Sequence, residues 1–151
     1  MDPSLGPKGT KPAWHDSEVT EQQARYDRIA AGYAAWWAPV HRPATLGLLD
    51  EIAPAMASGA TRVLDIGCGT GALAGAVAVR WPRARVTGVD ISAGMLAIAA
   101  RTVEELPGSA GDRVALVHAP AEALPFPDGA FDVAVTAFVL QLVPSRARAL
   151  G

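Results

Sequence analysis

The stretch VLDIGCGTGALAG, residues 63–75, decides the fold of this chain. A short buried strand, predicted at Arg62–Ile66, runs into three glycines that alternate with other residues, and a helix of small apolar residues follows. Glycine tolerates positive φ angles and has no Cβ, so Gly67, Gly69 and Gly71 let another molecule approach the main chain. The start of the following helix directs free N–H groups at such a molecule. The stretch therefore predicts a ligand-binding loop between a strand and a helix.

Strand and helix patterns alternate through the rest of the chain. Ser92 caps the second helix of this series, which ends before Pro107. Such alternation predicts an α/β fold with a Rossmann-like parallel sheet and right-handed crossovers. The predicted strands are 62–66, 85–90, 113–118 and 131–137, and the predicted helices are 71–80 and 92–106.

Composition divides the chain into three parts. Residues 1–16 are rich in Pro, Gly, Lys and Ser and are predicted to form a flexible tail. Residues 17–58 are predicted to form N-terminal helices. Residues 59–151 are predicted to form a Rossmann-like ligand-binding domain.

Prolines and a capping pattern set the expected bounds of the N-terminal helices. Thr20 begins a capping-box pattern, and Pro39 is expected to end the first helix. A second helix is predicted to have Pro43 in its first turn and a kink or interruption at Pro54. Four residues of the first helix are expected to share one face: Tyr26, Ile29, Tyr33 and Trp37.

The bulk composition indicates a soluble globular domain. The 151 residues are 50% hydrophobic and 19% charged, which suits a single domain with a core. The net charge of −2 and the lack of a basic stripe predict no nucleic-acid partner. No apolar run has transmembrane length and no signal-peptide pattern is visible, so no membrane partner is predicted. Cys68 is the one cysteine, which excludes an intrachain disulfide and favours a cytoplasmic location.

An acidic residue at the end of the second strand completes the pattern. Asp90 lies 19 residues after Gly71, where a carboxylate can accept hydrogen bonds from both hydroxyls of a ribose. Ligands of open α/β sheets bind beyond the carboxyl ends of the strands, and both the loop and the acid lie there. Together they predict a nucleoside-binding site.

Two nucleoside cofactors fit this pattern. The residues Gly67-x-Gly69-x-x-Ala72 match the dinucleotide fingerprint of NAD-binding domains. Asp65 would place a negative charge beside a pyrophosphate, whereas it would favour the ammonium group of S-adenosylmethionine. Asp65 thus favours S-adenosylmethionine, with an NAD-dependent oxidoreductase domain as the alternative.

Three motifs in order resemble those of a known family. "VLDIGCGTG", "VTGVDIS" and "ALPFPDGAFDVAVTAFVLQLV" resemble successive motifs of class I S-adenosylmethionine-dependent methyltransferases. The branch they resemble is that of small-molecule methyltransferases related to ubiquinone and menaquinone biosynthesis. "YDRIAAGYAAWW" is also similar to the helix that precedes the cofactor domain in that branch. The resemblance covers Tyr26–Val143 and implies methyl transfer to a small-molecule acceptor.

The resemblance implies a role for each motif position. Asp65, Gly67 and Gly69 would border the methionine moiety of the cofactor, and Asp90 would hold its ribose. Cys68 belongs to the same cofactor-binding loop as a small residue, not as a nucleophile, because the motif contains no histidine. Two further residues would line the adenine pocket, or would simply pack in the core: Ile91 and Met95.

The segment after the third strand departs from the family pattern. The family places there an acid that accepts a hydrogen bond from the adenine amino group, but this chain has Pro120, which lacks a side-chain acceptor. Ala121 can still offer its N–H to the adenine ring. Glu122 either substitutes for the missing acid or is a solvated surface residue.

The family also implies where the methyl group is transferred. Thr136, Ala137 and Phe138 fall at this mouth of the cofactor site, and Gln141 lies where a substrate-facing polar residue often sits. Two tyrosines of the first helix would close over the cofactor or make core contacts: Tyr26 and Tyr33.

No catalytic residue is assigned from the sequence. His15, His41 and His118 lack metal-ligand spacing with one another or with a Cys or carboxylate cluster, so no metal site is predicted. His41 is a conceivable general base. The base and the acceptor atom therefore stay open.

The resemblance further predicts that the chain is a fragment. The family sheet has seven strands, whereas about four are predicted here, in the order 3-2-1-4, with residues 133–137 at an exposed edge. We expect mainly the cofactor-binding half of an enzyme, with possible association through that edge strand. A non-catalytic module that binds a nucleoside ligand is a further alternative.

Overall fold

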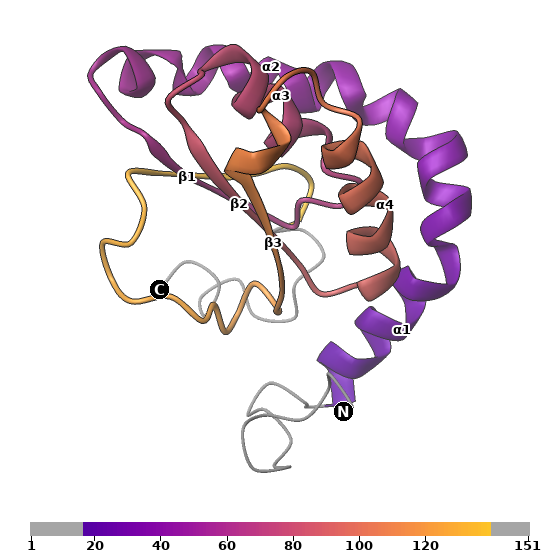
Figure 1. The fold of residues 1–151 in the computed structure, drawn as a ribbon. Helices are drawn as coiled ribbons and strands as arrows, with labels where there is room; N and C mark the ends of the chain where they lie inside the picture. The colour runs from indigo at the N-terminus through magenta and orange to yellow at the C-terminus, as the bar shows by residue number, and fades with distance from the viewer. Residues whose placement is uncertain (1–16, 140–151) are drawn as a thin grey trace.

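A four-stranded parallel sheet forms the centre of the structure, a computed structural model that describes residues 17–139. The strand order is β3-β2-β1-β4, which confirms the α/β class and the order predicted from the sequence (Figure 1). Val63 pairs with Val86 on one side and with Val133 on the other, so β1 lies inside the sheet. The strands are β1 (Arg62–Ile66), β2 (Arg85–Asp90), β3 (Val114–His118) and β4 (Val133–Thr136).

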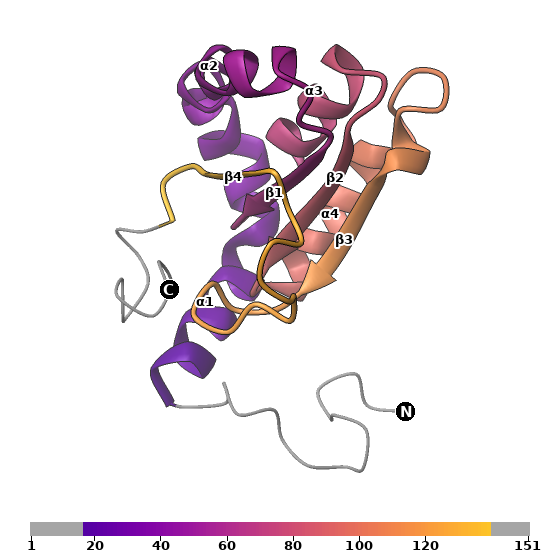
Figure 2. The same ribbon diagram turned by 90° about the vertical axis from the view of Figure 1, so that its left-hand side faces the viewer.

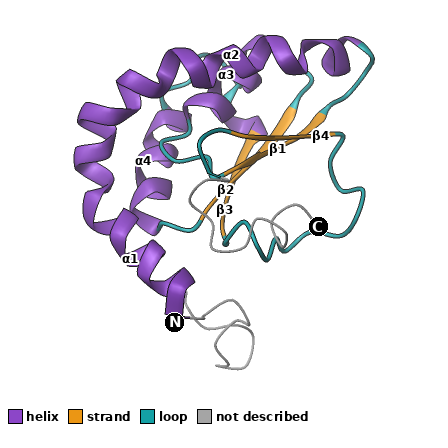
Figure 3. Cartoon of the chain, turned by 180° about the vertical axis from the view of Figure 1, so that it is seen from behind, coloured by secondary structure: helices purple, strands orange, loops and turns teal. Residues whose placement is uncertain are grey.

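Helices cover one face of the sheet and a long loop covers the other. Figures 2 and 3 show the helices on one side of the strands and residues 119–132 crossing the opposite side. None of the helices within residues 17–139 is long and apolar enough to cross a membrane. The helical elements are α1 (Ser17–Gly32), the π-helix η1 (Tyr33–Trp37), α2 (Ala38–Ala57), α3 (Ala72–Arg80), α4 (Ala93–Glu104) and the 3₁₀ turn η2 (Gly111–Arg113).

Each face of the sheet has its own apolar core because successive strand residues point to opposite faces. On the helical face, Val63 packs in a cluster with Leu73 and Val77 of α3. On the other face, Leu64 packs in a cluster with Phe126 of the long loop. The loop therefore replaces a helical layer on that side of the sheet.

The first three helical elements follow one another without a break, so several predicted boundaries are wrong. Thr20 lies inside α1, and Pro39 lies in the first turn of α2 instead of ending a helix. The π-helix η1 widens the helical turn just before α2. Because a residue in the first turn of a helix needs no N–H donor, Pro39 fits there and the chain stays helical. Pro43, expected in a first turn, lies inside α2, and Pro54 does not interrupt that helix.

The four residues expected on one face of the first helix do not share one environment in the structure. Tyr26 and Tyr33 line a pocket at the sheet edge, whereas Ile29 and Trp37 are exposed. The buried side of α1 includes the small residue Ala30, because α1 packs on α4. The two tyrosines are thus the members of this set that face the site.

Two strands are shorter than predicted. Arg113, expected in the third strand, lies in η2, where its backbone N–H donates to the Ala110 carbonyl instead of to a neighbouring strand. The Arg113 guanidinium donates to the carbonyls of Ala78 and Trp81 and so satisfies the end of α3. The fourth strand is limited to residues 133–136, which leaves Ala137 beyond its end.

Some sequence predictions lie outside the described residues. These are the flexible tail at residues 1–16 and the substrate-facing role of Gln141. The division into a tail, N-terminal helices at 17–58 and a ligand-binding domain at 59–151 stays a prediction.

Gly71 joins the glycine loop to α3 where the chain is crowded. Its φ of 81° lies in the left-handed region, and an added Cβ would lie 3.1 Å from the Cβ of Ala99 on α4. Gly129, in the loop before β4, has a similar φ of 71°, but an added Cβ there would meet nothing within 4 Å. The two glycines share the backbone requirement and differ in packing.

Gly71→Ala is expected to lower the free energy of unfolding by about 1–3 kcal/mol more than Gly129→Ala, because only Gly71 adds overpacking to the strain that both share. Urea denaturation of the two variants measures the difference. Equal destabilisation would contradict a close contact between the glycine loop and α4.

Candidate functional site

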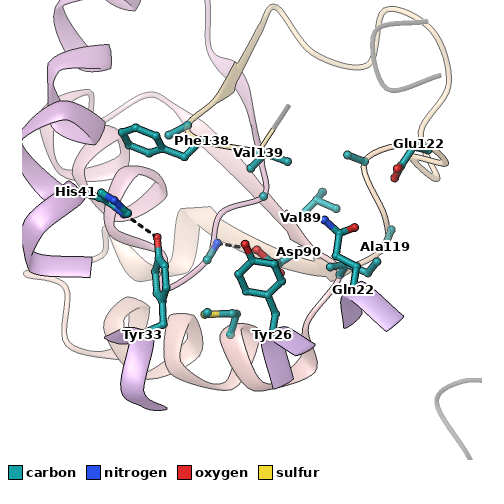
Figure 4. Close-up of a pocket in the computed structure, with 16 residues that line it drawn as sticks. Gln22, Tyr26, Tyr33, His41, Val89, Asp90, Ala119, Glu122, Phe138 and Val139 are labelled. Atoms are coloured by element: carbon teal, nitrogen blue, oxygen red, sulfur yellow. Dashed lines mark hydrogen bonds between the residues drawn. The ribbon is translucent and has the colours of Figure 1, made fainter. Parts of the chain in front are cut away.

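A cavity of about 180 Å³ opens at the carboxyl ends of the strands, where ligand sites of open α/β sheets occur (Figure 4). Residues from the glycine loop, from the end of β2 and from the start of α4 form one side: Gly67, Gly69, Asp90, Ile91 and Met95. Three more predicted residues line it from other segments: Tyr33, Ala121 and Glu122. The fold thus brings together residues as far apart in the chain as Gln22 and Val139.

Asp90 fixes the glycine loop in place. Its Oδ2 accepts a hydrogen bond of 2.8 Å from the Gly69 N–H, and its Oδ1 accepts one of 2.9 Å from the Ser92 N–H. Burial raises the pKa of Asp90, and the bonds from Ser92 and Gly69 oppose that rise. Each carboxylate oxygen has a second lone pair, so Asp90 can still accept hydrogen bonds from a ligand in the cavity.

Asp65 and Cys68 line a second, adjoining cavity of about 60 Å³ instead of the larger one. Asp65 is 2% exposed, and its Oδ2 has no hydrogen-bond partner among the described residues. Burial raises the pKa of Asp65 to about 7. Burial also raises the pKa of the Cys68 thiol, which keeps it protonated and supports its assignment as a small loop residue. Thr136, the remaining predicted contact, lines neither cavity.

The N-terminal helices form the opposite side of the larger cavity. Figure 4 shows Tyr26 and Tyr33 pointing into it, with Tyr26 in front of Asp90. The Tyr33 hydroxyl and His41 Nδ1 share a hydrogen bond of 3.2 Å, and the His41 ring stacks on Phe138 with 4.8 Å between ring centroids. Phe138 has a φ of 60°, which is strained for an aromatic residue. The implied mouth of the site is therefore an aromatic cluster.

Sequence reasoning missed several residues that shape the site, and two of them lie on α1. Gln22 lines the larger cavity from α1, and Asp27 binds the start of α4. Neither belongs to a local motif, because each acts on a segment distant in the sequence. His41 was considered only as a base, and its contacts with Tyr33 and Phe138 also depend on chain segments that meet in the fold.

The place of Glu122 suits a substitute for the acid that the family pattern has where this chain has Pro120. It lines the larger cavity, and its Oε1 is buried without a hydrogen-bond partner among residues 17–139. Pro120, in place of the expected acid, is fully buried. A buried carboxylate oxygen without a donor is costly, so this position favours a ligand that brings one.

A family model described as a methyltransferase domain matches residues 63–151, from β1 onward. This chain belongs to that family. The matched region of the methyltransferase domain includes the glycine loop, Asp90 and Glu122, and the N-terminal helices precede it. The fold and the motif order are those of the class I S-adenosylmethionine-dependent methyltransferases that the sequence resembles.

Two relatives of the methyltransferase domain carry names with different acceptors. This chain is 44% identical over 90 residues to the demethylmenaquinone methyltransferase of Thermus thermophilus, covering 60% of this chain and 39% of that protein. It is 37% identical over 130 residues to the malonyl-[acyl-carrier protein] O-methyltransferase of Geobacter sulfurreducens, covering 83% of this chain and 45% of that protein. The chain therefore spans less than half the length of either relative.

One solved structure extends the comparison beyond methyl transfer. The methyltransferase domain matches the crystal structure of the [4+2]-cyclase SpnF with a TM-score of 0.56 and 37% sequence identity. The match covers 61% of this chain and 33% of that chain. Similarity of fold and sequence thus includes a protein named for a different reaction.

The raised pKa of Asp65 predicts how stability changes with pH. The folded chain holds this proton more tightly than the unfolded chain, whose Asp has a pKa of 3.8, so stability falls as pH rises from about 4 to about 7. Asp65→Asn removes this contribution while keeping the size of the side chain. The wild type should therefore lose stability relative to Asp65→Asn, by up to about 1.4 kcal/mol per pH unit in that window.

Urea denaturation of both proteins between pH 4 and 8 measures this relative loss. The difference should level off above about pH 7, where both states are ionised. Parallel stability profiles of the two proteins would contradict the burial of an ionisable Asp65.

Proposed function

We propose that this chain binds S-adenosylmethionine and forms mainly the cofactor-binding half of an enzyme that methylates a small molecule. One observation carries the proposal: in a chain of the methyltransferase family, the nearly buried Asp90 carboxylate is held beside the glycine loop by the Gly69 N–H. A carboxylate at the end of β2 is placed to accept bonds from the ribose hydroxyls of a nucleoside.

Unpartnered polar atoms test whether this cofactor fits. Asp65 Oδ2 and Glu122 Oε1 are both buried and lack donors among the described residues. S-adenosylmethionine offers an ammonium group at one end and an adenine amino group at the other. Arg42 also lines the small cavity with Asp65, so one acidic and one basic side chain face a group that carries both charges. The residues present therefore suit the amino-acid end of this cofactor.

The remaining predicted contacts take roles within the same proposal. Ile91 and Met95 would flank the adenine, and the Ala121 N–H would reach a ring nitrogen. Tyr33 would close the cofactor site from the N-terminal helices, and the backbone of Cys68 would border the methionine moiety. Thr136 would act through the strand end that supports Ala137 and Phe138, since it lines neither cavity.

Positioning is the main task of the chain in this reaction. The cofactor supplies a methyl group on a sulfonium, which becomes a neutral thioether when an acceptor atom attacks. Asp90 and Asp65 would hold the ribose and the ammonium, so the methyl group has a fixed direction. Phe138 and His41 stack at the mouth of the site, where they would limit the approach of the acceptor and the access of water.

Electrostatics favours this cofactor over NAD. Among residues 17–139, no lysine or arginine lines the larger cavity, whereas Asp90 and Glu122 do. Those two residues would face the ribose and the adenine, which NAD also carries, whereas Asp65 borders the glycine loop, where a pyrophosphate would lie and like charges repel at short range. A cytoplasmic location and association through the β4 edge stay predictions from the sequence.

Isothermal calorimetry with S-adenosylmethionine, S-adenosylhomocysteine and NADH tests the cofactor. We expect both sulfur ligands to bind and NADH not to bind. Asp90→Ala should weaken S-adenosylhomocysteine binding by about 1–3 kcal/mol, because hydrogen bonds to a charged group are lost. Asp50→Ala is the matched control, since Asp50 is an exposed residue that pairs with Arg80 on the helical side.

A preference for NADH would overturn the proposed cofactor, and unchanged affinity of Asp90→Ala would overturn the ribose contact. Methyl transfer itself requires an assay of a longer chain with labelled cofactor, because the matched region covers less than half of either relative. The similarity to a cyclase makes that assay necessary even when the cofactor binds.

Glu122 should make the site selective for adenine. S-inosylhomocysteine, in which the 6-amino group is replaced by a 6-oxo group, offers an acceptor where Glu122 needs a donor. Wild type should prefer S-adenosylhomocysteine over S-inosylhomocysteine by about tenfold or more. Glu122→Gln should narrow or reverse the preference, because its amide donates to a 6-oxo group. Equal binding of both ligands by the wild type would contradict this role.

A further inference from the structure

Asp27 of α1 binds the start of α4, a segment 65 residues away in the chain. Its Oδ1 accepts hydrogen bonds from the Ser92 hydroxyl at 2.6 Å and from the Gly94 N–H at 3.0 Å. Ser92, the N-cap of α4, is fully buried. A carboxylate is favoured at a helix N-terminus because it satisfies free N–H groups and faces the positive end of the helix dipole.

Close packing accompanies these bonds. An added Cβ at Gly94 would lie 3.1 Å from the Cβ of Ala30 and 3.4 Å from the Cα of Asp27. Ala30 is itself buried. The two helices therefore meet at small residues, and Asp27 has little freedom to bind elsewhere.

The hydrogen bonds continue from Asp27 to the cofactor carboxylate. Ser92 donates its hydroxyl to Asp27 and its N–H to Asp90 Oδ1, and the second bond is 2.9 Å long. Asp90 Oδ2 then accepts from the Gly69 N–H at 2.8 Å. An unbroken series of hydrogen bonds thus joins α1, the start of α4, the end of β2 and the glycine loop.

The same helix brings side chains into the cavity. Gln22 and Tyr26 line it from α1, and Tyr33 follows in η1. Figure 4 shows the ring of Tyr26 in front of Asp90 and the Tyr33 hydroxyl directed toward His41. Burial raises the pKa of both tyrosines, with a further contribution from the charge of Asp90. The place of α1 therefore determines how the cavity is closed.

We propose that Asp27 is a positioning residue of the cofactor site: it fastens α1 to α4, so that the tyrosines close over the ligand while Ser92 holds Asp90. Asp27 does not line the cavity itself, so it acts through the residues that do. This inference rests on the proposed function, because the ligand it helps to hold is S-adenosylmethionine or its product.

Three variants of the 151-residue chain test this role by calorimetry with S-adenosylhomocysteine and by thermal unfolding. Asp27→Ala should weaken binding by about tenfold or more. Asp27→Asn should stay within about threefold of the wild type, because the amide oxygen can accept both bonds from α4. Asp50→Ala is the control for loss of an α-helical carboxylate outside the site, and its affinity should not change.

A double-mutant cycle separates positioning from general stability. Tyr26→Ala is measured in the wild type and in Asp27→Ala, below the thermal midpoint of each protein. If Asp27 places Tyr26 over the ligand, the loss of Tyr26 costs less affinity once Asp27 is gone, so the two effects are not additive. Additive effects would overturn the inference.

Other outcomes separate this inference from the proposed function. A lower thermal midpoint of Asp27→Ala with unchanged affinity would overturn the inference, as would Asp27→Asn binding as weakly as Asp27→Ala. Absence of S-adenosylhomocysteine binding to the wild type would overturn the proposed function and the inference with it.

Discussion

The carboxylate of Asp90 holds together the segments that form the cofactor site. It ends β2, accepts the Gly69 N–H of the glycine loop, and accepts the Ser92 N–H at the start of α4. Because the side chain is only 9% exposed, these bonds are what makes a negative charge acceptable there. The shape of the loop and the start of the helix therefore depend on one side chain, and the proposed ribose contact would depend on it too.

In the proposed cofactor complex, desolvated carboxyl groups would give the site its selectivity. Asp65 and Glu122 each have a buried oxygen without a donor in the chain. A buried acceptor without a donor lowers the stability of the folded chain. A ligand that donates hydrogen bonds to these oxygens would remove that cost, so its binding would be favoured. A cationic amino-acid end and an amino-bearing base offer such donors, whereas a pyrophosphate between them would not.

Local motifs predicted the centre of the fold well. The strand, glycine loop and helix around Gly67 and Gly69 are adjacent in sequence, and their φ angles and apolar spacing act over a few residues. Helix boundaries near Pro39 were predicted wrongly, because a π-helix accommodates the proline where a straight α-helix would end. Asp27 was missed because its partners lie on another helix, and no spacing along the chain encodes that contact.

The sequence by itself determined the alternation of strands and helices, the strand order, the glycine loop and the acid at the end of β2. The strand order was implied by the resemblance to the methyltransferase family, whereas the other features follow from short-range sterics and periodicity. The tertiary structure decided which side chains share the cavity: it separates Asp65 from Asp90 into adjoining cavities, turns Tyr26 and Tyr33 inward, and docks Asp27 on α4. Burial and long-range packing decide these placements, and neither is a property of a residue and its near neighbours.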